Sequence, residues 1–450
     1  MIVQAKNLIS KIGIDGAVFF TVMSKVLQAG GGVISIVFIA RYLSKVEQGY
    51  YYTFGSILAI QIFFELGFTG IITQYVAHEK ALLTWKDEIY LIGDQKALSR
   101  MSSLLRFCLK WFGVLSVALF LGLLLAGYSF FENYGDGNSS VEWRMPWFIM
   151  SFYTAITLVM SPIFAFLEGL GKVKQIAQIR LIQQCVQLLI MFALLIFGAK
   201  LFASPISVLI SLIVPIFLLF FRSEKKILKN LWVSIGEWKV DYRKEIFPFQ
   251  WRIALSWISG YFMFQLFNPV IFATEGAKVA GQMGMTLSVL GGVLSVALSW
   301  VSTKVPLFSG LIAQKNYVTL DRVFYKTLIQ ASTVCLFCIL IFIGGVYVLK
   351  YYNTPSGDRF LPLYLVILLA LCTFTTQLIN ALATYLRCHK KEPFLVYSIV
   401  MGLLTAGSIF LFGHLYGIDG IVGGYAFLTV IVSFMWALYI FKTKKNNWHG

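Results

Sequence analysis

The sequence predicts an all-α membrane protein of about twelve transmembrane helices, arranged as two bundles of six with both chain ends in the cytoplasm. The first observation behind this prediction is composition: of 450 residues, 58% are hydrophobic and 13% are charged, and the mean hydropathy is +0.79. A water-soluble domain carries about 25% charged residues, so this chain has too few polar side chains to cover a surface that faces water. The other two observations are the length of the apolar runs and the placement of the basic residues.

The apolar material is divided into runs of about 20 residues, the length that crosses a bilayer as a helix. In lipid the backbone must satisfy its own hydrogen bonds, and these long continuous runs are typical of helices, whereas a barrel would need short alternating strands. No cleavage pattern of a signal peptide follows the first run, so we expect that run to stay as a helix. Helices are predicted over 17–40, 49–75, 104–128, 146–168, 176–198, 201–221, 248–272, 279–303, 323–348, 360–386, 394–414 and 420–441.

Lysine and arginine set the predicted orientation. If both chain ends are cytoplasmic, 26 of the 37 basic residues lie on cytoplasmic segments, 7 lie on the opposite side and 4 lie within spans. This bias is the positive-inside pattern of membrane proteins. We therefore attribute the net charge of +17 to contact with the cytoplasmic lipid surface and expect no nucleic-acid partner.

A basic stretch divides the chain into two halves. The predicted domains are an N-terminal six-helix bundle (1–221), a cytoplasmic linker (222–247) and a C-terminal six-helix bundle (248–450). The halves look alike where their first two helices join, because Lys45-Val46 and Lys278-Val279 each precede a glycine and a helix start. Six is an even number of spans, so the halves would be parallel repeats. Two such bundles with a cavity between them are expected of an alternating-access transporter.

Two ionisable residues lie deep in predicted spans. Lys25 is about 12 Å into the first helix, and Glu65 is about 15 Å from the cytoplasmic end of the second, at 1.5 Å per residue. A charge in hydrocarbon costs about 2.5–3.5 kcal/mol, so such groups usually face a partner or a cavity. Two interpretations stay open: a structural ion pair, or a lysine that binds an anionic substrate while Glu65 tunes its release.

Two arginines lie about one turn inside predicted spans, Arg180 in the fifth and Arg252 in the seventh. Either they extend to the cytoplasmic interface, or they form a cationic entrance for a diphosphate, which a guanidinium binds in a bidentate manner. Lys110 and Glu168 lie near span ends and are interpreted as interfacial.

No catalytic constellation is visible. Cys335 and Cys338 form a CxxC within an apolar run, without a second ligand pair, and the four histidines are too dispersed for a metal site. No nucleotide-binding loop and no large outer loop are present. We therefore expect a protein that is not an enzyme and that holds no metal or cofactor.

Several segments resemble one family. ARYLSKVEQGYY after the first helix, and FQWRIALSWISGYF, GQMGMTLS and WVSTKVPLFSGLIAQKNYVTLDRVF in the second half, are similar to the polysaccharide-transporter branch of the multidrug/oligosaccharidyl-lipid/polysaccharide (MOP) exporter superfamily. These are bacterial O-antigen and capsule flippases, and the twelve-helix layout is MATE/MOP-like. The residue-level likeness is concentrated in the first two helices and in 248–325.

The resemblance implies that the chain flips an undecaprenyl-diphosphate-linked oligosaccharide across the bacterial inner membrane. Basic residues line the cavity in such families, and the matching positions here are Lys25 and Arg252, with Arg180 as a third and Glu65 as their acidic neighbour. The second half has no lysine at the depth of Lys25, so a symmetric site is in doubt. The implied partners are the lipid-linked oligosaccharide, membrane lipids, a polysaccharide polymerase and a chain-length regulator.

Two alternatives stay open. A cation-coupled multidrug exporter of the same superfamily would need acidic residues in a compact apolar cavity, and Glu65 alone offers little for that. A membrane-bound transferase of polysaccharide assembly would need a histidine or an acidic pair at a membrane face, and only His414 comes near. Coupling to H⁺ or Na⁺ is left open as well.

Overall fold

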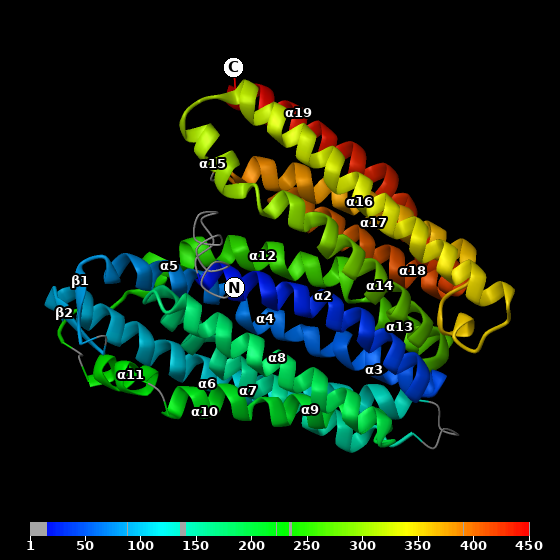
Figure 1. The fold of residues 1–450 in the computed structure, drawn as a ribbon, viewed down its shortest axis with the longest axis horizontal. Coiled ribbons are helices and arrows are strands. Elements are labelled where there is room, and N and C mark those ends of the chain that lie inside the picture. Colours follow the sequence, from blue (N-terminus) through cyan, green and yellow to red (C-terminus); the bar gives the residue numbers. More distant parts are fainter. Residues whose placement is uncertain are drawn as a thin grey trace, which may run out of the picture. The chain divides into compact units, whose positions relative to one another are not determined.

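The structure is a computed structural model that describes residues 16–87, 89–135, 141–221, 223–233, 236–389 and 391–449. These residues are almost entirely helical (Figure 1). The helices are α2 (Gly16–Tyr42), α3 (Lys45–Leu58), η1 (Ala59–Gln61), α4 (Ile62–Glu65), α5 (Phe68–Lys80), α6 (Gln95–Tyr134), α7 (Arg144–Gly169), α8 (Val173–Ile196), η2 (Lys200–Phe202), α9 (Ala203–Ser211), α10 (Ile213–Phe221), α11 (Ser223–Val233), η3 (Tyr242–Ile246), α12 (Phe247–Phe264), α13 (Phe267–Glu275), α14 (Ala277–Ser302), α15 (Val305–Ala313), α16 (Tyr317–Tyr351), η4 (Gly357–Arg359), α17 (Leu363–Arg387), α18 (Leu395–Phe427), η5 (Leu428–Ser433) and α19 (Phe434–His449).

In the described part of the chain, a small sheet interrupts the helices. Strands β1 (Leu83–Lys86) and β2 (Tyr90–Gly93) pair antiparallel, with Leu83 opposite Gly93. The sequence did not predict this hairpin, which lies in the segment between the second and third predicted spans.

The length and composition of the helices agree with a multi-pass membrane protein. Among the described residues, eight helices are long and apolar enough to cross a bilayer, or nine if the bent pair Lys45–Glu65 and Phe68–Lys80 forms one span. The count of twelve stays a prediction. Helix α18 runs through the predicted turn at 414–420, and its backbone is non-helical at Gly417 (φ 59°, ψ −143°), where that turn is predicted.

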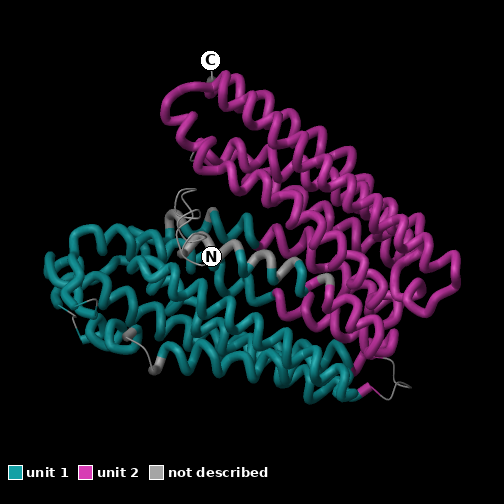
Figure 2. The backbone as a smooth tube through the Cα atoms, viewed as in Figure 1, with its two compact units in different colours: residues 1–31, 60–131, 142–257 teal, residues 32–59, 132–141, 258–450 magenta. Residues whose placement is uncertain are grey.

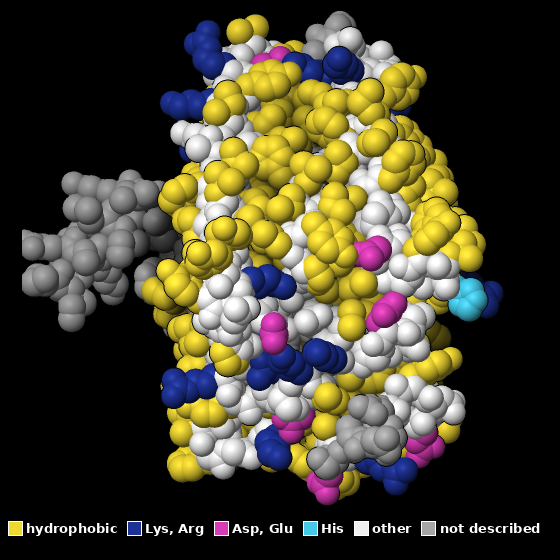
Figure 3. Space-filling view, turned by 90° about the vertical axis from the view of Figure 1, so that its right-hand side faces the viewer, with side chains coloured by type: hydrophobic (Ala, Val, Ile, Leu, Met, Phe, Trp, Pro, Cys, Tyr) yellow, Lys and Arg dark blue, Asp and Glu magenta, His cyan; other side chains and the backbone are white. Residues whose placement is uncertain are grey.

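The outer faces of the helices are apolar. Figure 3 shows a face on which hydrophobic side chains form broad continuous areas and charged side chains gather in a few clusters. Helix α16 illustrates the composition of such a face, since Ile329, Phe337, Leu340 and Ile341 are each more than half exposed. Large exposed apolar surfaces of this kind are stable against lipid, not against water.

The described contacts divide the chain into two compact units (Figure 2). Unit 1 consists of 1–31, 60–131 and 142–257, and unit 2 consists of 32–59, 132–141 and 258–450. Residues 32–59 belong to the predicted N-terminal bundle by sequence, yet they pack in unit 2, where α3 lies along α14. The predicted division at the 222–247 linker stays a prediction about the chain.

In unit 1 the linker is bound to α6. Ser99 Oγ donates a hydrogen bond to the carbonyl of Trp238 at 2.7 Å, and Arg100 forms an ion pair with Glu245 at 2.5 Å. The described part of the linker around Trp238 and Glu245 is therefore bound to unit 1.

In unit 2 the C-terminal helix is held by a buried aromatic cluster and a polar contact beside it. Phe324, Tyr385 and Phe441 pack together from α16, α17 and α19. The Tyr385 hydroxyl donates to Asp321 at 2.6 Å, and Lys445 pairs with the same carboxylate at 2.7 Å. These contacts fix α17, which forms one wall of the pocket described next.

Candidate functional site

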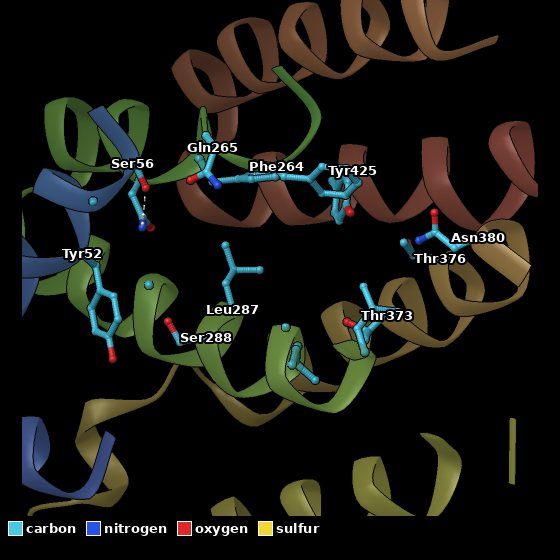
Figure 4. A pocket seen from close by; sticks show the side chains of 17 residues that line it. Tyr52, Ser56, Phe264, Gln265, Leu287, Ser288, Thr373, Thr376, Asn380 and Tyr425 are labelled. Atoms are coloured by element: carbon cyan, nitrogen blue, oxygen red, sulfur yellow. Dashed lines mark hydrogen bonds between the residues drawn. The ribbon is translucent and has the colours of Figure 1, made fainter. Parts of the chain in front are cut away.

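A pocket of about 500 Å³, lined by both polar and apolar side chains, lies inside unit 2. Seventeen residues line it, and Figure 4 shows side chains from α3, α14, α17 and α18 that surround one space. On α14 the lining runs from Gly284 to Leu294, which is about 10–25 Å from the helix start at Ala277. The pocket is therefore at mid-span depth. Its polar side chains are Tyr52, Ser56, Gln265, Asn268, Ser288, Thr373, Thr376, Asn380 and Tyr425.

Helical spacing produces this lining. Thr373, Thr376 and Asn380 are three and four residues apart on α17, so they share one face of the helix. On α14, Gly284, Ser288 and Gly291 share a face in the same way, and their small side chains leave the space open. A polar stripe in an otherwise apolar span is costly unless it meets other polar groups or a ligand.

The hydrogen bonds inside the pocket are incomplete. Asn268 Nδ2 donates to Ser56 Oγ at 3.1 Å, and both residues are buried. Asn268 Oδ1 has no hydrogen-bond partner among the described residues. A buried acceptor without a partner costs about 1–3 kcal/mol, so this oxygen is available to a donor from a ligand.

The chemical character of the pocket follows from its lining. Among the described residues none of the seventeen carries a charge. Amides and hydroxyls provide both donors and acceptors, while Phe264, Phe267 and Tyr425 add aromatic surface. Such a site fits a neutral molecule rich in hydroxyl groups better than an ion.

A close helix crossing lies one turn from the pocket, at the predicted extracytoplasmic end of unit 2. Gly49 of α3 and Gly281 of α14 meet there, and a Cβ added to Gly49 would lie 1.9 Å from the carbonyl oxygen of Ala277. Tyr52 and Gly284, each three residues further along, line the pocket. We call this crossing the Gly49–Gly281 seam, and it joins the two segments whose likeness predicted the repeat.

A loop reinforces the seam. Gln48 Nε2 donates to the carbonyl of Gly281 at 2.8 Å, and Arg359 Nη2 donates to the carbonyl of Leu43 at 2.6 Å. Lys45 forms an ion pair with Asp358 at 2.8 Å. Polar contacts thus hold α3, α14 and η4 together in this structure.

The seam has a defined pH dependence. The pKa of Asp358 is lowered, because Lys45 donates a hydrogen bond to its carboxylate and attracts its charge. A lowered pKa means that the ion pair is present near neutral pH and is lost only when the pH falls through that lowered value. We expect the small difference in melting temperature between wild type and Asp358→Asn to be constant from about pH 5 to 8 and to shrink in stronger acid. A difference that grows on acidification would contradict this assignment.

Glu65 and Arg180, two of the predicted site residues, lie in unit 1. Glu65 ends α4 and accepts a hydrogen bond from Gln61 Nε2 at 2.8 Å. Arg180 pairs with Glu168 at 3.0 Å, is 53% exposed in its side chain, and also interacts electrostatically with Glu65. Glu65, Arg180 and Glu168 therefore form one group, which we call the charge cluster of unit 1. Glu168 is the residue that the sequence predicted to be interfacial.

The cluster borders a break in the second span. Leu66 and Gly67, which follow Glu65, have φ of 48° and 67°, and the helices on either side are bent by 40°. A Cβ on Gly67 would lie 2.4 Å from Ile253 Cγ2. The segment that contains Arg252 thus approaches the break that follows Glu65.

The other two predicted site residues have side chains that are not described. Lys25 lies in α2 and Arg252 in α12, but both side chains are outside the described part of the chain, so the predicted Lys25–Glu65 pair stays a prediction.

Cys335 and Cys338 are free thiols on α16. Among the described residues no group of three His, Cys, Asp or Glu side chains could hold a metal.

Comparison of folds gives the broader context. No family model matches the sequence, and no curated protein matches it. A MATE family multidrug resistance transporter of the MOP superfamily, in an inward-facing conformation, matches with a TM-score of 0.57 and 15% identity over 93% of this chain and 99% of that chain. The MATE multidrug transporter DinF-BH, solved as a complex, matches with a TM-score of 0.58 and 12% identity over 96% of both chains.

A flippase is among the similar structures as well. The lipid II flippase MurJ, in an inward closed conformation, matches with a TM-score of 0.54 and 15% identity over 96% of this chain and 90% of that chain. At these identities the likeness concerns the fold. The chain therefore has the multi-pass helical fold of MOP superfamily transporters.

Proposed function

We propose that this protein is a flippase that moves an undecaprenyl-diphosphate-linked oligosaccharide across the bacterial inner membrane by alternating access. The observation that carries the proposal is the uncharged pocket at mid-span depth in unit 2, where nine polar side chains stand among apolar ones. A sugar presents many hydroxyl groups, each a donor and an acceptor, and the amide and hydroxyl lining can bind them. A polysaccharide polymerase and a chain-length regulator would act on the product.

The charge cluster of unit 1 supplies the second element of the proposal. In it Glu65 and Arg180 interact, and the Arg252 segment approaches through Ile253. We assign Lys25, Arg180 and Arg252 to binding of the diphosphate, with Glu65 as the acidic group that limits how tightly the anion is held. Guanidinium groups suit this role because they bind phosphate oxygens in a bidentate manner.

The multidrug exporter is the competing function. DinF-BH is a multidrug transporter and MurJ is a flippase, so the similarity of folds does not separate the two classes. The pocket lining favours the sugar, because an organic cation is stabilised by a carboxylate and none of the lining residues provides one. Glu65 is the acidic residue that a drug exporter would use.

The experiment that tests the proposal is a flipping assay. The purified protein is reconstituted into vesicles with an undecaprenyl-diphosphate oligosaccharide, and the sugar that reaches the outer leaflet is measured with an added lectin. We expect protein-dependent exposure of the sugar and no efflux of an organic dye cation. Dye efflux without sugar exposure would assign the protein to the multidrug class.

A charge-neutralisation series tests the diphosphate site. We expect Lys25→Ala and Arg252→Ala each to lower surface polysaccharide about 10- to 150-fold, because each removes a charge-assisted contact worth about 1.5–3 kcal/mol. Lys110→Ala, at an exposed position on α6, should have no effect. The amount of protein in the membrane is measured by immunoblot in every strain, and normal polysaccharide in the double variant would refute the assignment.

A further inference from the structure

A second cavity, in unit 1, is of the opposite chemical character. It has a volume of about 380 Å³ and is formed by α7, α10 and α11. Seven of its eight lining residues are aliphatic or methionine, and the eighth is Lys225. We call it the Lys225 groove. A water-soluble metabolite has nothing to bind on such walls, whereas a hydrocarbon chain would be stabilised along their whole length.

The position of the groove matches the depth of a lipid in one leaflet. On α7 it runs from Ile156 to Ile163, which is about 9–20 Å from the helix end at Gly169. On α10 it reaches Leu219, two residues before the helix ends. Lys225 follows at the start of α11, so a cation stands at the interfacial end of an apolar channel that extends into the span.

Helix α11 has the character of a helix that lies on a membrane surface. Ile227 and Leu231 are buried, whereas its three lysines are exposed: Lys225, Lys226 and Lys229. Its one acidic residue, Glu224, is 2% exposed, so the exposed charge of this helix is entirely positive. The positive-inside bias of the sequence predicts the cytoplasmic leaflet for this helix.

The C-terminal end of α11 is also fixed. Arg106 of α6 donates to the carbonyl of Trp232 at 3.1 Å and lies over the indole ring at 4.9 Å. Trp232 itself is partly exposed, as tryptophan often is at a bilayer interface. The lysines of α11 are therefore held in a fixed position next to the groove.

From these observations we propose that the Lys225 groove binds one anionic phospholipid of the cytoplasmic leaflet. An acyl chain would lie against Ile156, Val159 and Ile163, and the phosphate would meet the lysines of α11. The complementarity is specific in charge as well as in shape, because a zwitterionic headgroup gains less from three exposed lysines. This lipid is a structural lipid that stays bound to the protein, and it is distinct from the transported molecule.

The test uses the full-length protein purified in detergent, with bound lipid counted by native mass spectrometry after addition of phosphatidylglycerol or phosphatidylcholine. We expect retention of one phosphatidylglycerol and little phosphatidylcholine. Lys225→Gln should weaken binding about fivefold, the effect of one basic residue near a membrane surface. Val159→Trp should fill the groove and remove the lipid.

The matched control is Lys244→Gln, which removes the same charge from a lysine of the linker that is 86% exposed and outside the groove. It should bind as wild type does. Equal retention by Lys225→Gln and wild type, or equal binding of both phospholipids, would overturn the proposal. Displacement of phosphatidylglycerol by undecaprenyl diphosphate would also overturn it, because the groove would then belong to the substrate. Lipid counts are independent of transport, so this result and the flipping assay can fail separately.

Discussion

Replacing Gly49 by alanine is expected to hinder closure of the Gly49–Gly281 seam and to lower the rate of transport. The added Cβ would lie 1.9 Å from the carbonyl oxygen of Ala277, and a backbone atom cannot rotate away as a side chain can. Helices α3 and α14 would have to separate by about 1.5 Å to restore normal contact. The Gln48–Gly281 hydrogen bond, now 2.8 Å, would then be too long.

The size of the effect follows from the cost of overpacking. A well-packed contact loses about 1–3 kcal/mol when an extra methyl group is inserted, which shifts the ratio of closed to open states about 5- to 150-fold. Alternating access requires both states, so the rate of flipping should fall by a similar factor. The amount of the variant in the membrane is measured by immunoblot, which separates a loss of folded protein from a loss of transport.

Gly292→Ala is the matched control. It lies on α14, the other helix of the seam, outside the pocket lining, and a Cβ there meets nothing within 4 Å. Closure is measured by labelling Ser288→Cys from outside with an impermeant maleimide, in a background where the six native cysteines are replaced. Labelling should be faster in Gly49→Ala than in Gly292→Ala. Equal labelling and equal transport would show that the seam does not act as a closure.

Much of the fold could be predicted because length and hydropathy are strong local signals. The break predicted at 414–420 coincides with the non-helical backbone of Gly417, where a glycine permits a positive φ. The hairpin of β1 and β2 was missed because its four-residue strands have no distinctive pattern. The packing of 32–59 with unit 2 could not be predicted either, because it depends on contacts between distant parts of the chain.

The sequence draws attention to charged residues more readily than to polar ones. Ionisable residues in an apolar run are conspicuous, so Glu65 and Arg180 were singled out, and in the structure they interact electrostatically. Their role in binding a substrate stays a proposal. The polar pocket was missed because threonine and asparagine are common in membrane helices as packing residues. A signal was present, since Thr373, Thr376 and Asn380 follow the i, i+3, i+7 spacing of one helix face.

Asn268→Leu is expected to raise the KM for the lipid-linked oligosaccharide about 5- to 150-fold. Leucine has a similar size but removes both the donor to Ser56 and the acceptor Oδ1, which has no partner in the described structure. Leaving a sugar hydroxyl buried without a partner costs about 1–3 kcal/mol, and this cost gives the range. The maximal rate should change less, because Asn268 is not part of the Gly49–Gly281 seam. Flipping is measured against substrate concentration in vesicles.

Two further variants distinguish a pocket that binds the sugar from a pocket whose polar side chains serve only the packing of the helices. Thr274→Val on the same helix removes a hydroxyl that bonds only to the carbonyl of Val270 at 3.1 Å, outside the pocket, and should leave the KM unchanged. Asn268→Asp keeps the shape and adds a negative charge, which repels a diphosphate-linked substrate and favours an organic cation. If Asn268→Asp still flips the oligosaccharide with a normal KM and Asn268→Leu does so too, the pocket does not hold the sugar. If both variants fail and Thr274→Val does not, hydrogen bonding by an uncharged amide is the property that the transported molecule requires.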